Sequence, residues 1–119
     1  MDQGLIAMNE LLNQIEYLLR RHDCVYEANS VELARRELAT DLEHFWTLLN
    51  SDEWWGGPDS ISSIDLAIRS GFSQQGREDS RELRRLLIEV HDAMLAQGLE
   101  NPKALIIVAE FRKWLASRI

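Results

Sequence analysis

The side chains with the clearest metal-like spacing in this sequence are Asp41 and His44, which stand three residues apart. Metal-binding helical bundles use acids and histidines at this spacing because such side chains project from one face of a helix. A second half-site is missing, since apolar residues stand three positions before both His22 and His91. We therefore assign no metal ligands and no cofactor to this sequence.

Nucleophilic catalysis needs a serine, threonine or cysteine held beside an oriented base. Ser60, Ser62 and Ser63 stand where the start of a helix requires small polar residues. The single cysteine, Cys24, fits a small hydrophobic residue at a helix end, because no pattern of basic neighbours marks it as an activated thiol. The one glycine pair lacks the lysine and the spacing of a phosphate-binding loop. The sequence therefore predicts no catalytic residue and no enzymatic activity.

Two adjacent tryptophans, Trp54 and Trp55, precede two glycines and a proline and are the most unusual feature of the chain. One interpretation is that the indoles fold back and plug the end of a helical bundle, because tryptophan buries a large area. The other is a recognition loop, because tryptophan is enriched at binding hot spots and Asp52, Glu53 and Asp59 surround these two with negative charge. In the second interpretation these five residues bind a basic partner.

Charge is divided unevenly along the chain, whose net charge is -7. Residues 23–65 contain ten acidic residues and two arginines, whereas residues 69–118 contain nine basic and seven acidic residues. The acidic part would repel a phosphate backbone. The arginines at 77, 81, 84 and 85 alternate with acids at helical spacing, which favours a salt-bridged surface over a nucleic-acid site. We expect a protein partner and no nucleic acid.

Length and composition indicate one globular domain over residues 1–119. A chain of 119 residues can bury one core, and its apolar content of 45% and charged content of 28% are ordinary for a folded protein. No segment approaches the roughly 20 apolar residues that span a bilayer. The first residues have the pattern of a helix and not of a signal peptide. We therefore expect a cytoplasmic protein with no membrane partner.

The elements that must position these residues are predicted to be helices. Apolar residues at spacings of three and four predict long helices over residues 4–22 and 29–50, from Asp79 to just before Gly98, and from Pro102 through Ile106, Ala109 and Trp114. The starts are indicated by capping boxes, Asn29 with Glu32 and Asp79 with Glu82, and by Asn101 before Pro102.

Between these helices the sequence predicts one short helix and two irregular segments. The short helix covers residues 61–70, buries Ile61, Ile64 and Ile68, and stops at Gly71. Residues 51–60 form the main loop and residues 72–78 a flexible connector. The expected fold is all-α: an antiparallel bundle of four long helices with one short helix after the tryptophan loop.

The segment WWGGPDSISSIDL, residues 54–66, resembles the central motif of a group of small bacterial helical proteins. Proteins of this size and acidity often resemble the immunity proteins encoded beside antagonistic toxins. The resemblance implies a binding role, supplies no catalytic residues, and covers about a tenth of the chain.

Two functions follow from these observations. The first is an immunity-type inhibitor that covers a basic toxin domain with its acidic central region, because complementary charge speeds association and suppresses wrong partners. The second is a cytosolic adaptor or regulatory homodimer without catalytic activity, which pairs through a helix face. A toxin-like reading frame beside the gene would favour the first function, and dimerisation without such a neighbour would favour the second.

Overall fold

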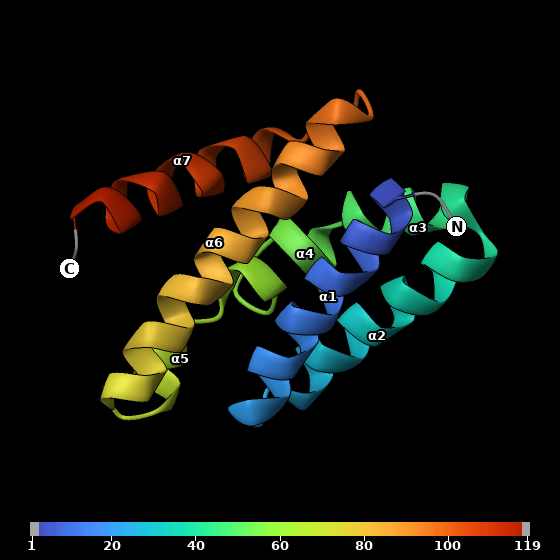
Figure 1. The fold of residues 1–119 in the computed structure, drawn as a ribbon. Helices are drawn as coiled ribbons and strands as arrows, with labels where there is room; N and C mark the ends of the chain where they lie inside the picture. The colour runs from blue at the N-terminus through green and yellow to red at the C-terminus, as the bar shows by residue number, and fades with distance from the viewer. Residues whose placement is uncertain (1–2, 118–119) are drawn as a thin grey trace.

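The computed structural model describes residues 3–117, and every regular element among them is helical, as the sequence predicts. The first two helices, α1 (Gln3–Arg21) and α2 (Val25–Thr40), form a hairpin and lie side by side (Figure 1). The predicted apolar stripe of α1 supplies five buried residues: Met8, Leu12, Ile15, Leu18 and Leu19. The chain reverses at Asp23, which has a left-handed φ of 59°. Cys24 directly precedes α2, and its side chain is buried in the core.

The predicted helix over residues 29–50 is wrong at its start and in its continuity. Asn29 lies inside α2, so it caps no helix, and its side-chain oxygen accepts a hydrogen bond from Arg20 at 3.2 Å. The helix breaks at Asp41, and α3 (Leu42–Leu49) begins there. Asp41 has extended backbone angles and accepts a hydrogen bond from the backbone N–H of His44 at 3.1 Å. Capping by Asp41 therefore favours a new helix over continuation of α2.

The segment after α3 is more regular than the sequence predicts. Residues 52–55 form a one-turn helix, α4 (Asp52–Trp55), inside the predicted loop. The predicted helix over residues 61–70 is instead a 3-10 turn, η1 (Ile61–Ser63), followed by α5 (Leu66–Arg69). Asp65 starts α5 by accepting a hydrogen bond from the backbone N–H of Ala67 at 2.9 Å. Because of this break, Ile68 is exposed and not buried as predicted.

The longest helix, α6 (Gln74–Ala96), begins five residues before its predicted capping box. Ser73 is the true cap, because its hydroxyl accepts a hydrogen bond from Gly76 N–H at 3.0 Å. Asp79 lies within the helix, is buried, and contacts His22 Nε2 at 2.8 Å. Burial opposes ionisation of Asp79, but hydrogen bonds from His22 and Gln75 with the charge of Arg21 outweigh it and lower its pKa. The predicted connector over residues 72–78 is therefore largely helical.

The last helix, α7 (Pro102–Ser117), starts as predicted, since the side chain of Asn101 accepts a hydrogen bond from Ala104 N–H at 3.1 Å. It buries Ala104, Val108 and Phe111. Figure 1 shows α7 packed on α6, with its C-terminal end directed away from α1 and α2. Four helices are long, α1, α2, α6 and α7, but the second is shorter than predicted, and this arrangement does not confirm an antiparallel four-helix bundle. Among residues 3–117, no helix is long and apolar enough to cross a membrane.

Candidate binding surface

The two adjacent tryptophans belong to the core. Trp54 and Trp55 each expose 1% of their surface. The indole N–H of Trp55 donates a hydrogen bond to the carbonyl of Leu49 at 2.9 Å, and its ring meets His91 edge-on with centroids 6.1 Å apart. Neither indole is therefore presented to a partner in this structure, and both fix α4 to the helices around it.

The backbone after the tryptophans turns in a way that requires glycine. A Cβ added at Gly56 would lie 2.3 Å from the Cβ of Asp52, which is closer than real atoms approach. Gly57 has φ of 152°, in the region that side chains disfavour. The glycines therefore allow the chain to leave α4 tightly and return towards η1, which fixes the residues on either side of the turn.

The acids predicted to bind a partner gather around one depression. Asp52, Glu53 and Asp59 are exposed and, with Tyr26 and the turn at residues 56–58 and Ser60, line a hollow of about 260 Å³. We refer to these residues as the acidic hollow. Its described lining holds three carboxylates and no basic side chain. Asp52 also pairs with Lys103 at 3.1 Å, but both side chains are largely exposed, so this pair competes weakly with an incoming cation.

A second depression, of about 350 Å³, lies directly beside the acidic hollow, and Gly57 and Ser60 line both. One wall is the segment of residues 57–65 and the other is α7. The wall on α7 is a stripe at helical spacing, made by Ile106, Ile107, Glu110, Phe111 and Trp114. We call this depression the apolar groove. Sequence reasoning missed it because α7 is apolar on more than one side, so periodicity alone did not identify the exposed stripe.

Arg84 of α6 contacts both walls of the apolar groove. Its guanidinium lies 4.5 Å from the ring centroid of Trp114 and 3.6 Å from the Asp65 carboxylate on the opposite wall. Burial lowers the pKa of Arg84, and the charge of Asp65 opposes that effect. This arginine belongs to the predicted basic stripe, and its contacts are those of a salt-bridged, cation–π side chain.

The serines near the groove are used in local structure. The Ser60 hydroxyl donates to the carbonyl of Gly57 at 2.7 Å and lies 3.1 Å from the Ser62 hydroxyl. The Ser63 hydroxyl donates to backbone carbonyls of the same turn, including that of Ser60 at 2.7 Å. These bonds hold the groove wall in place. Ser60 directly precedes η1, but its hydroxyl makes no cap hydrogen bond because it donates to a backbone carbonyl.

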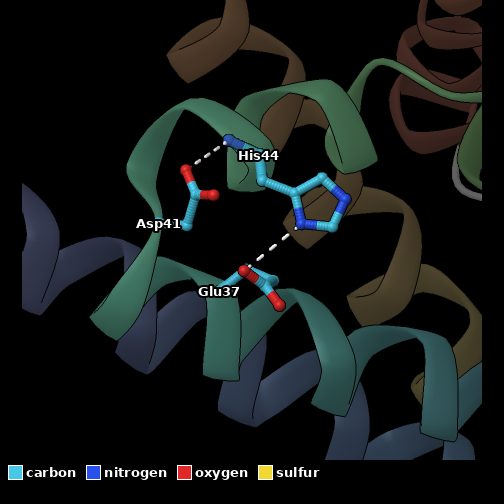
Figure 2. A group of neighbouring side chains, drawn as sticks. All are labelled: Glu37, Asp41 and His44. Atoms are coloured by element: carbon cyan, nitrogen blue, oxygen red, sulfur yellow. Dashed lines mark hydrogen bonds and ion pairs between the residues drawn. The ribbon is translucent and has the colours of Figure 1, made fainter.

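A separate cluster at the break between α2 and α3 brings Glu37 beside Asp41 and His44 (Figure 2). Their ligand atoms lie within 4.8 Å of one another, and this set of groups suits a divalent metal such as zinc. Each group also has a structural contact: His44 Nδ1 lies 3.2 Å from a Glu37 oxygen, and Asp41 caps α3. The sequence prediction missed Glu37 because it treated Asp41 as the interior of a helix.

The buried side chain of His91 lines neither the acidic hollow nor the apolar groove. It is 2% exposed, and neither ring nitrogen has a hydrogen-bond partner among residues 3–117. Burial lowers the pKa of His91, the charge of Asp92 opposes this, and that of Arg112 adds to it. The imidazole is therefore held neutral against Trp55.

In comparisons with known proteins, no family model, curated protein or solved structure matches the chain.

Proposed function

We propose that this protein binds another protein through the acidic hollow and acts as an immunity-type inhibitor of a bacterial toxin with a basic surface. The exposed carboxylates of Asp52, Glu53 and Asp59 support this proposal because they lie around one hollow whose described lining contains no basic side chain. A basic partner would be attracted over a distance of about one Debye length, ~8 Å at physiological salt.

The buried tryptophans support the same proposal indirectly. Trp54 and Trp55 directly follow Asp52 and Glu53 on α4, and their burial fixes that helix. A fixed acidic surface loses little conformational entropy on binding, so more of the interaction energy is retained as affinity. The role proposed for the tryptophans is therefore to position the acids and not to contact the partner.

The test uses the protein encoded by the reading frame beside the gene as the partner. Reversing the three acids together, Asp52→Lys, Glu53→Lys and Asp59→Lys, is expected to slow association about tenfold or more and to reduce its salt dependence. The matched control reverses Glu10, Glu78 and Glu100, which are exposed and line neither depression. Equal association rates for the two triple variants, or no binding by the unmodified protein, would contradict the proposal.

A cytosolic adaptor or regulatory homodimer remains the second candidate. The observation that favours it is the exposure of Leu105, Ile106 and Trp114 on α7. Light scattering during size-exclusion chromatography distinguishes the two functions, since a stable dimer without a toxin-like neighbour would support the adaptor.

A further inference from the structure

We infer that the apolar groove is the second half of the same interface and takes an amphipathic helix of the partner, with basic residues at the end next to the acidic hollow. This inference rests on the proposed function and specifies the partner's chemistry. Its first support is continuity: Gly57 and Ser60 line both depressions, so a ligand that fills one meets the other. The two depressions therefore form one surface, apolar at one end and acidic at the other.

The dimensions of the groove fit a short helix. Along α7, the lining stripe runs from Ile106 to Trp114, a span of about 12 Å at the rise of an α-helix. A partner helix of two to three turns covers this span and presents apolar side chains at positions i, i+4 and i+7. Ile106 is 67% exposed and Trp114 is 45% exposed, so both have apolar area left to bury.

The walls of the groove are already held in place without a ligand. Arg84 joins them by contacting Trp114 on α7 and Asp65 on the opposite wall. Trp114 also packs on Phe111, with ring centroids 6.0 Å apart. A preformed groove does not have to be ordered on binding, which lowers the cost of association.

Charge decides between the possible occupants. The described groove lining adds Asp65, which is paired with Arg84, and Glu110, which lies 3.4 Å from the ammonium of Lys113. Together the described linings of the two depressions contain five carboxylates. Asp52, Asp65 and Glu110 each have a cationic partner, and Glu53 and Asp59 keep the surface net negative. A second copy of this chain would bring a net charge of -7 and its own Glu110 to the same surface. Charge repulsion disfavours that occupant, whereas a helix carrying Lys or Arg is attracted.

The experiment uses a labelled helical peptide of 18 residues, with leucines at i, i+4 and i+7 and lysines at one end, and measures anisotropy and amide shifts. Two control peptides replace the lysines with glutamates or scramble the sequence. We expect the leucine–lysine peptide to bind about tenfold or more tightly than either control, and to shift the amides of Gly57, Ile106 and Trp114. No binding at millimolar peptide, or equal binding of all three, overturns the inference.

The matched variants are Ile106→Glu and Leu105→Glu, adjacent residues of α7 with exposures of 67% and 60%. Only Ile106 lines the groove. Ile106→Glu should weaken peptide binding about tenfold or more, and Leu105→Glu should leave it nearly unchanged. Equal effects of the two variants overturn the inference, because the peptide would then bind exposed apolar residues of α7 without preference for the groove.

The failure of this inference can be separated from failure of the proposed function. If the neighbouring-gene partner binds and loses affinity on reversal of Asp52, Glu53 and Asp59 but not on Ile106→Glu, the acidic hollow is the interface and the groove is not. If Ile106→Glu instead converts a dimer to a monomer, the occupant is a second copy and the inference is wrong. Loss of affinity in both variants, with Leu105→Glu unaffected, supports the combined surface.

Discussion

The tryptophans of α4 and the tryptophan near the end of α7 differ in burial. Trp54 and Trp55 stand beside glycines and a proline, yet they are fully enclosed. Trp114 lies in a regular amphipathic helix, yet it is 45% exposed and lines a groove. Burial of a tryptophan is therefore decided by the elements packed around it and not by whether its own segment is a loop or a helix.

Under the proposed function, the two regions have different roles. The α4 tryptophans hold the segment that carries the acids, while Trp114 offers its surface to a partner under the inference drawn above. Substitutions in the first region should mainly change stability, and substitutions in the second should mainly change binding.

The largest expected effect is the loss of a core indole. Trp55→Ala or Trp54→Ala should reduce the free energy of unfolding by about 3 to 5 kcal/mol, because a cavity replaces a fully buried side chain. Urea unfolding followed by circular dichroism measures this loss, with Trp114→Ala as the parallel control. A loss below about 1 kcal/mol at both positions would show that α4 is not anchored by its tryptophans.

The next largest effect on stability is expected at Gly56, where the chain turns directly after α4. Gly56→Ala should reduce the free energy of unfolding by about 1 to 3 kcal/mol, because the new Cβ overlaps Asp52 and the backbone must shift. Asp59→Ala is the control, since this exposed residue lies on the same segment. Thermal unfolding of both variants gives the comparison, and equal melting temperatures would argue against a constrained turn.

A smaller, pH-dependent effect is expected from His91 beside Trp55. The pKa of His91 in the folded protein lies below its value of about 6.5 in the unfolded chain. As the pH falls below about 6.5, the unfolded chain therefore binds more protons at His91 than the folded protein does. The stability associated with neutral His91 is therefore complete above about pH 6.5 and declines below it, by at most about 1.4 kcal/mol per pH unit.

His91→Leu should remove this decline, since leucine carries no titrating group and fills an apolar site. The check is the difference in free energy of unfolding between the two proteins from pH 7.5 to 5, which isolates His91 from the other histidines. A difference that stays constant across this range would mean that His91 titrates equally in the folded and unfolded states.

The smallest effect on stability is expected at Trp114. Trp114→Ala removes a partly exposed indole and its contact with Arg84, so the cost should be about 1 kcal/mol or less. The same variant should lose part of the tryptophan fluorescence that acrylamide quenches, because Trp54 and Trp55 are enclosed and the partly buried Trp46 supplies the remainder. Unchanged quenching would show that Trp114 is as shielded as the core pair and would remove the contrast.

Features fixed within one helical turn could be predicted from the sequence. The all-helical class follows from apolar spacing, and the start of α7 follows from Asn101 and Pro102. The stops near Gly71 and Gly98 are also confirmed, with left-handed φ values of 68° and 77°. These features depend on capping and backbone preference, which involve neighbours in sequence.

Local capping patterns give wrong helix starts where longer-range structure decides the backbone. Asn29 with Glu32 and Asp79 with Glu82 have the form of capping boxes, but both pairs lie inside helices. At Asp79 the carboxylate is occupied by His22 from the end of α1, a contact that no local pattern contains. The sequence nevertheless identified Asp52, Glu53 and Asp59 as acids of one short segment, and the structure places them around one hollow.

Sequence by itself therefore determined the helical class, several helix ends and the position of the acidic segment. Only the tertiary structure decided that Trp54 and Trp55 are enclosed, that Trp114 is open to solvent, and that α7 faces the segment of residues 57–65 across a groove. The physical reason is that helix formation and capping are short-range, whereas burial depends on which distant surfaces meet. The enclosure of Trp55 needs Leu49 and His91 together, and the groove needs Arg84 to join its two walls.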